Sequence, residues 1–252
     1  MPRSSAPPPP SGSSVAALRS REGWPSGSFA ARLSESSCRD LLGLSVADRV
    51  PAGTVLIRQG DPSISVYLLR PASRRAIACA KVAAVLENGH DGLLGIRVSG
   101  DIVGELGVVR SARRTATVTT CAPTLVQAIA QDIFLRFLAE HPDAWRAVSA
   151  TIADRLEWAN QWRLEYAAHD VLTRVARILL MLSERHGHPT PDGQDLGLPI
   201  SQEELGHLIG ARRDTVVKCV GLLRSRNLIK TAYRRIIITN PGGLRALAQI
   251  GS

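Results

Sequence analysis

The sequence predicts an α+β protein, with an N-terminal β-roll or jelly roll, one long helix and a compact C-terminal domain of short helices. Short apolar runs broken by Gly, Pro and Asp fill residues 40–142, which is typical of small all-β domains. Residues 143–169 contain neither Gly nor Pro and have helical periodicity. Two short amphipathic segments joined at a glycine follow within residues 170–252. The chain of 252 residues is 44% hydrophobic, which is enough for two modest domains.

The charge balance predicts a polyanionic partner. Lys plus Arg total 31 against 22 for Asp plus Glu, which gives a net charge of +9 and a pI near 10.2. This balance favours nucleic acid or an anionic membrane surface. No apolar run approaches the roughly 18 residues of a membrane span, and the N-terminus lacks the apolar core of a secretory signal. We therefore expect a cytoplasmic protein with no membrane partner.

The cysteine spacing argues against several classes of site. The chain has four cysteines and no Cys-x-x-Cys pair, so zinc ribbons and thioredoxin-type chemistry lose support. A disulfide framework is also unusual in a chain this long and this poor in cysteine. We expect four reduced structural thiols and no metal site. The cysteines are Cys38, Cys79, Cys121 and Cys219.

Residues 1–39 are predicted to be a largely disordered arm, and residues 40–142 the roll. Pro, Ser and Gly dominate the start of the arm, and its apolar content is too low to offset the entropy of ordering. In the roll, threonines at 115, 117 and 119 alternate with Ala116 and Val118, so one face of that strand is polar and the other apolar. The predicted strands are 54–58, 66–69, 81–86, 93–98, 115–120 and 125–130.

The long helix carries two apolar stripes. A helix with two apolar faces needs two partners, and we expect these to be its own roll and the same helix of a second copy. The alternative is a helix buried within one monomer. One stripe consists of Val148, Ile152, Ala159, Trp162 and Tyr166, and the other of Trp145, Ile152, Leu156 and Ala159.

The C-terminal domain has the spacing of a helix-turn-helix. Ser201 and Glu204 form a capping box that starts a short helix. Gly206 leaves room for a second helix, and Gly210 permits the sharp turn before that helix starts near Ala211. The domain also contains a predicted helix and a loop that precede this motif, and two strands that follow it as a wing. These segments are 171–184, 186–198, 227–231 and 235–239.

The outward face of the second helix carries the side chains that a recognition helix needs. Arginine can bind guanine bidentately, and a carboxylate can accept a hydrogen bond from cytosine. The alternative is that these charged side chains only form a solvated face of the helix. Residues 170–252 hold 12 Lys plus Arg against 7 Asp plus Glu, so more than half of the net charge lies in a third of the chain. The predicted base contacts are Arg212, Arg213 and Asp214, and Lys218 suits either a base or a phosphate. The predicted phosphate contacts of the wing are Lys230, Arg234 and Arg235.

Three motif regions, in this order and at these separations, resemble the Crp/Fnr family of bacterial transcription regulators. The resemblance covers about residues 40–245. Residues 51–62 resemble the opening strands of the family's cyclic-nucleotide-binding roll, 100–106 with 113–118 resemble its phosphate-binding cassette, and 202–217 match its DNA-reading helices. The resemblance implies that Ser201, Gln202 and Thr215 join the DNA-binding set. Because Arg213-Asp214-Thr215 replaces the family's Arg-Glu-Thr, it also implies a different operator sequence.

The resemblance assigns roles to residues of the phosphate-binding cassette, and Leu106 is also a member of this set. A short helix after Gly104 would offer N–H groups to a cyclic phosphate. Arg114 would neutralise the phosphate, Thr115 would donate a hydroxyl, and Glu105 would accept from a ribose hydroxyl. The alternative is that Glu105 and Arg114 form only an internal salt bridge.

Two departures from the family bear on the choice of effector. Ala159 and Asn160 stand where the family has base-contacting Thr and Ser, and of the two only Asn160 can pair with a purine edge. The chain between Tyr67 and Gly104 is also longer than is typical of the family. No cofactor is assigned, and cAMP and cGMP are candidates.

We therefore predict a homodimeric, sequence-specific DNA-binding transcriptional regulator whose roll binds a cyclic nucleotide or another small effector. The expected partners are double-stranded operator DNA, a second copy and RNA polymerase, and the expected hinge lies near His169-Asp170. Two alternatives stay open: an effector-independent regulator with a degenerate pocket, and a non-specific architectural DNA binder. The sequence contains no nucleophile elbow, phosphate loop, zinc-protease motif or paired catalytic carboxylates, so we expect no catalytic residues and no enzyme.

Overall fold

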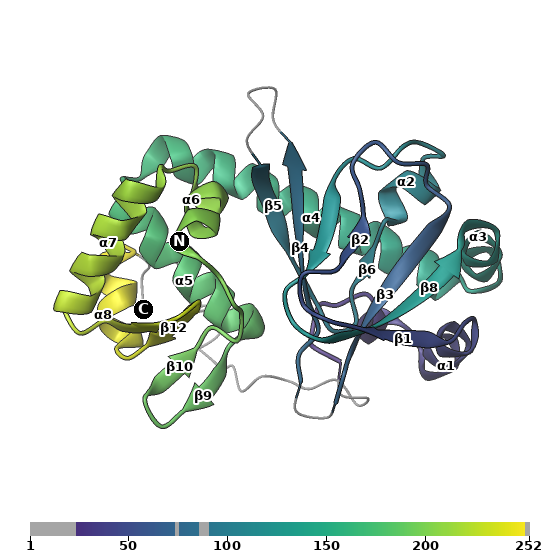
Figure 1. Cartoon of the computed structure of the whole chain (residues 1–252), viewed down its shortest axis with the longest axis horizontal. Helices are drawn as coiled ribbons and strands as arrows, with labels where there is room; N and C mark the ends of the chain where they lie inside the picture. The colour runs from purple at the N-terminus through teal and green to yellow at the C-terminus, as the bar shows by residue number, and fades with distance from the viewer. Residues whose placement is uncertain (1–23, 74–75, 86–90, 250–252) are drawn as a thin grey trace, which may run out of the picture.

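Two four-stranded sheets form the N-terminal half of the fold, which the computed structural model describes over residues 24–73, 76–85 and 91–249 (Figure 1). The strand orders are β1-β8-β3-β6 and β2-β7-β4-β5, and all pairs are antiparallel. Each of the six predicted strands is present. Two others, β1 and β6, were missed because one is polar and the other has only two residues. The strands are β1 (Ala47–Val50), β2 (Val55–Ile57), β3 (Ser65–Pro71), β4 (Cys79–Val85), β5 (Asp91–Val98), β6 (Ile102–Val103), β7 (Thr117–Thr120) and β8 (Thr124–Ala130).

The roll has an apolar interior between its two sheets. Ala116 and Val118 are buried while the threonines that alternate with them are not, which confirms the predicted alternation along β7. Val118 packs in one cluster with Leu69 and Val126 from the facing sheet. Two helices, α2 (Glu105–Val109) and α3 (Gln131–Glu140), interrupt and end the roll.

The predicted arm is ordered over its last part. A 3-10 turn at Ala30–Arg32 and helix α1 (Glu35–Gly43) lie within or overlap the segment that was expected to be largely disordered. Phe29 is fully buried in the cluster beneath α3, and Ser34 caps α1 and donates its N–H to Asp143 at 2.8 Å. This prediction was therefore wrong for residues 24–39, because single apolar residues anchor a segment whose composition is polar. Residues 1–23 lie outside the described part.

Helix α4 (Pro142–Ala168) runs along the roll and reaches the C-terminal half (Figure 1). Val148 and Trp162 of its first stripe are buried against this chain. On the second stripe, Leu156 is 61% exposed and Trp145 is 39% exposed. One stripe is thus occupied within the protomer, and the other faces outward.

The C-terminal half contains α5 (Val171–His186), α6 (Gln202–Ile209), α7 (Arg213–Ser225) and α8 (Pro241–Leu247) around a small sheet of order β11-β12-β10-β9. The expected capping box is present at Ser201, and Gly210 has a φ of 62° at the end of α6. A Cβ at Gly206 would lie 2.6 Å from the carbonyl oxygen of Ala211, which explains the need for glycine there.

The wing is present, but the segment before the helix-turn-helix differs from the prediction. The wing strands are β11 (Ile229–Ala232) and β12 (Arg235–Ile238). The segment predicted as a loop forms a hairpin of β9 (His188–Thr190) and β10 (Gly193–Asp195), and β10 pairs with β12. The strands are short and rich in Gly and Pro, so their pairing with the wing, rather than their own propensity, forms the hairpin.

The two halves contact each other where α6 faces β5 and β4 (Figure 1). Cys79, Leu93 and Val98 of the roll share an apolar cluster with α5 and α6. Lys81 of β4 forms an ion pair with Glu204 of α6 across this contact. In the described residues, no helix is both long and apolar enough to cross a membrane.

Candidate functional site

A cavity of about 530 Å³ lies beside α2, and both halves of the chain supply its wall. The roll contributes the residues around Gly104 and Arg114, and α4 contributes Trp158 and Ala159. The side towards the C-terminal half is closed by residues of α5 and α6, among them Met181, His186 and Leu208. A volume of this size is in the range of small-molecule sites. A ligand that filled this cavity would therefore touch the roll and the helical domain together.

Gly104 and Arg114 are locked together at the start of α2. The guanidinium of Arg114 donates to the carbonyl oxygen of Gly104 at 2.8 Å and to that of Ser65 at 2.6 Å. Gly104 has a φ of 87°, and a Cβ there would lie 2.4 Å from Nη1 of Arg114. Burial lowers the pKa of Arg114, although it stays a cation. A fixed, partly desolvated guanidinium beside free N–H groups is suited to an anion.

Glu105 is 2% exposed and pairs with α4 rather than with Arg114. Its carboxylate forms an ion pair with Arg155, which also donates to the carbonyl oxygen of Ile102 at 3.0 Å. The alternative of a Glu105–Arg114 salt bridge is absent, since Arg114 is bound to two carbonyl oxygens. The sequence analysis gave Arg155 no role, because this residue interrupts the first apolar stripe of the helix between Ile152 and Ala159.

The other predicted effector contacts divide between the cavity and the surface. Thr115 and Leu106 line the cavity. On α4, Ala159 lines the cavity, whereas Asn160 is exposed and is not part of its wall within this protomer. The structure thus brings together the cassette residues and leaves Asn160 apart from them.

The far end of the cavity is cationic and has unused polar atoms. Nε of Arg97 and Nδ1 of His186 are buried and have no hydrogen-bond partner. Burial, with Arg155 nearby, lowers the pKa of Arg97 to about 10, so it remains charged. Burial and the nearby Arg185 lower the pKa of His186 to about 4, so its ring is neutral at physiological pH. These donors and acceptors are available to a polar ligand.

The predicted recognition residues are all exposed on one end of α7. Arg212 caps the helix without a side-chain hydrogen bond, and the buried face of α7 consists of Val216, Val220 and Leu223. The exposed set is Arg212, Arg213, Asp214, Thr215 and Lys218. Ser201 and Gln202, at the start of α6, are half-buried, and the hydroxyl of Ser201 is used in the capping box.

The basic residues of the wing are already paired within the chain. Lys230 lies 2.6 Å from Asp192 in an exposed ion pair, and Arg234 lies 3.5 Å from Glu204. Arg235 forms an ion pair with Asp195. The Lys230–Asp192 pair is exposed on both sides, and such pairs are weak and exchange readily with other anions. Tyr233, at the tip of the wing, is 92% exposed.

Comparison with known proteins matches a known domain family to each half of the chain. Residues 173–247 match the Crp-like helix-turn-helix domain, and residues 47–141 match the cyclic nucleotide-binding domain. The chain belongs to the Crp/Fnr family of transcriptional regulators. It is therefore a DNA-binding transcriptional regulator with a cyclic nucleotide-binding domain and a helix-turn-helix domain, and the relatives that it matches are transcriptional regulators.

Individual relatives agree with this assignment of a Crp/Fnr regulator. A CRP-like cAMP-activated global transcriptional regulator of Mycobacterium tuberculosis is 27% identical over 75% of this chain and 82% of its own length. The cAMP-activated global transcriptional regulator CRP of Escherichia coli is 28% identical over 75% of this chain and 88% of its own. A CRP-family regulator from Thermus thermophilus has the same fold, with a TM-score of 0.65 at 20% identity, covering 80% of this chain and 96% of that one.

Proposed function

We propose that this Crp/Fnr regulator binds a cyclic nucleotide in the 530 Å³ cavity and that occupancy controls its affinity for operator DNA. The observation that carries the proposal is the shared wall: α5 and α6 of the DNA-binding half face the same cavity as the phosphate cassette. A ligand there contacts both halves, and its binding energy depends on their arrangement. The hinge would lie between α4 and α5, where Asp170 caps the start of α5.

The cassette supplies the chemistry for a cyclic phosphate. Arg114 would pair with the phosphate, the N–H groups at Gly104 and the hydroxyl of Thr115 would donate to it, and Glu105 would accept from the ribose. The cAMP-activated relatives make cAMP the first candidate and cGMP the second. Calorimetry of the full chain against both nucleotides tests the proposal. No heat of binding with either would favour the effector-independent alternative.

The exposed end of α7 is proposed to read the major groove. Arg213 would bind a guanine edge and Asp214 a cytosine amino group, with Lys218 on a base or phosphate. Lys230 and Arg234 would exchange their carboxylate partners for DNA phosphates. The operator would be found by selection from a random duplex library. A regulator should prefer the selected site by about 10³-fold or more at physiological salt, whereas an architectural binder would show nearly equal affinities.

A homodimer is proposed on the outward stripe of α4. Trp145 and Leu156 are large apolar side chains exposed on this helix, as a helix pairing with its own copy requires. Asn160 is exposed on the same helix and would reach the partner's nucleotide rather than its own. RNA polymerase is proposed as a further partner on the ground of the family alone. Sedimentation tests the dimer, and a monomer at micromolar concentration would refute it.

We also propose the division of the chain into a roll that ends at residue 142, a dimerisation helix at 143–169 and a DNA-binding domain at 170–252, whereas the predicted limit at residue 40 falls within α1 and is dropped. The bounds of α4 and the cap at Asp170 support these limits. Limited proteolysis should cut near residue 169, and resistance there would argue for one rigid unit.

A further inference from the structure

Two cysteines lie opposite each other at the end of the β4–β7 ladder. The register pairs Ala80 with Thr120 and Lys81 with Thr119, so the next position joins Cys79 and Cys121. The N–H of Cys121 donates to the carbonyl oxygen of Cys79 at 2.7 Å. Hydrogen-bonded antiparallel pairs have Cα atoms about 5.5 Å apart, which is inside the range of about 4.4–6.8 Å found for disulfides.

The two thiols influence each other: the side chain of Cys121 raises the pKa of Cys79, and that of Cys79 lowers the pKa of Cys121. The thiol of Cys121 also donates to the carbonyl oxygen of Thr119 at 3.9 Å. Lys81 and Arg234 add to the lowering at Cys121, while Glu204 opposes it. The pair thus has one thiol that ionises more readily and one that holds its proton.

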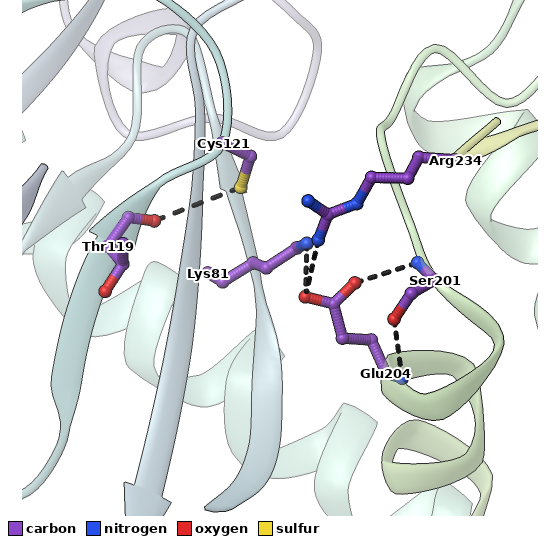
Figure 2. A network of polar contacts seen from close by, with 6 residues as sticks. All are labelled: Lys81, Thr119, Cys121, Ser201, Glu204 and Arg234. Atoms are coloured by element: carbon purple, nitrogen blue, oxygen red, sulfur yellow. Dashed lines mark hydrogen bonds and ion pairs between the residues drawn. The ribbon is translucent and has the colours of Figure 1, made fainter. Parts of the chain in front are cut away.

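Only one of these thiols is accessible. Cys121 lines a second cavity, of about 520 Å³, between the roll and α6, whereas Cys79 is buried at 2% exposure. Figure 2 shows Cys121 just past the end of β7, bonded to Thr119, with the side chain of Lys81 nearby meeting Glu204 and Arg234 of the DNA-binding half. The more acidic thiol is therefore the one that a small solute can reach.

We propose that Cys79 and Cys121 form a peroxide-reactive pair that closes to an intramolecular disulfide. The Cys121 thiolate attacks one oxygen of a hydroperoxide and forms an S–O bond while the O–O bond breaks, and the leaving oxygen takes a proton to give water or an alcohol. The sulfur of Cys79 then attacks the sulfenic sulfur of Cys121. The S–S bond forms, the S–O bond breaks, and hydroxide leaves as water with the proton of Cys79. The two thiols supply the two electrons that reduce the peroxide.

The disulfide would act on the contact between the two halves. Lys81 and Arg234, which help to lower the pKa of Cys121, both form ion pairs with Glu204, a capping residue of α6. A bond between Cys79 and Cys121 would fix the end of β7 to β4 beside Lys81, and so would change the surface of the roll on which α6 is held. This consequence rests on the proposed function, since it requires that the DNA-binding half move relative to the roll.

The test uses the full-length chain treated with hydrogen peroxide and then with iodoacetamide. We expect the wild type to lose two alkylatable thiols and to give a peptide that links Cys79 to Cys121. The Cys219→Ser variant is the matched control and should behave as the wild type. In Cys79→Ala, oxidation should stop at a sulfenic acid on Cys121 that dimedone traps. A disulfide between chains, or oxidation that leaves Cys79 and Cys121 alkylatable, would overturn the proposal.

A second readout separates this chemistry from the control of DNA binding. We expect oxidation to change the operator Kd of the wild type by at least about fivefold and to leave Cys121→Ser unchanged. An unchanged Kd in a protein that carries the linked peptide would refute the coupling alone. Absence of operator binding even in the reduced protein would refute the proposed function, while the mass measurement would still decide the thiol chemistry.

Discussion

Glu105 and Arg155 should contribute to the free energy of unfolding in a strongly non-additive way, because each charge is stabilised by the other. The Glu105 side chain is 3% exposed and that of Arg155 is 21% exposed. Loss of one partner from a buried pair costs about 3–5 kcal/mol. Arg155 keeps its bond to the carbonyl oxygen of Ile102 and some contact with water, so we expect about 2–3 kcal/mol for Glu105→Gln. Arg155→Met should cost a similar amount, because it leaves the carboxylate buried alone.

The double variant distinguishes a pair from two separate contacts. With both charges gone, no unpaired ion remains, so Glu105→Gln with Arg155→Met should be no less stable than either single variant. Urea unfolding followed by far-UV circular dichroism would then give a coupling energy of about 2 kcal/mol. The exposed pair Glu35–Arg39, with side chains 81% and 72% exposed, is the control and should couple by less than about 0.5 kcal/mol. Additivity at Glu105 and Arg155 within about 0.5 kcal/mol would refute the reasoning.

Further predictions concern DNA, effector and pH. Arg213→Ala should weaken binding to the selected operator by about 1–3 kcal/mol in fluorescence anisotropy and relax preference at one base pair, whereas Arg226→Ala, also exposed but at the other end of α7, should do neither. Equal losses on all duplexes would make Arg213 a phosphate contact. Arg114→Ala should remove nucleotide binding in calorimetry, and retained binding would refute the cassette assignment. His186, with a pKa of about 4 against an ordinary value of 6.5, is protonated more readily in the unfolded chain, so stability should fall as pH falls between these values. His186→Phe should flatten that part of the profile in thermal unfolding, and an unchanged slope would contradict this account. Tyr166→Phe removes a 3.1 Å hydrogen bond to the carbonyl oxygen of Leu208 and should lower the free energy of unfolding by about 1 kcal/mol, with no loss contradicting a role in the contact.

The fold could be predicted where a local pattern also decides the tertiary structure. The alternating threonines of β7, the capping box at Ser201 and the glycine at 210 each satisfy a local rule that the packing then uses. The hairpin of β9 and β10 and the order at Phe29 could not be predicted in this way. Their stability comes from β12 and from the cluster beneath α3, which lie far away in the sequence.

In the candidate site, too, contacts between side chains far apart in the sequence could not be predicted. Sequence spacing placed Glu105 and Arg114 in one cassette, but the partner of Glu105 is 50 residues away on α4. Arg155 breaks an apolar stripe, and the pattern alone gave no reason to assign it a partner. In the same way, Ala159 and Asn160 are neighbours in sequence, yet a step of one residue turns the side chain by about 100° around the helix, so only Ala159 faces the cavity.

The route from the cavity to the recognition helix consists of direct contacts. Trp158 lines the cavity and donates its indole N–H to the sulfur of Met181 on α5 at 3.1 Å. Further along α4, the hydroxyl of Tyr166 donates to the carbonyl oxygen of Leu208 in α6. Arg174 of α5 donates to the carbonyl oxygen of Ile209 in α6 at 2.8 Å. A ligand that moves Trp158 must therefore move α5 or lose this contact. Because α5 packs against both α6 and α7, a displacement of α5 would reach the helix that carries the exposed arginines, as the proposed effector control requires.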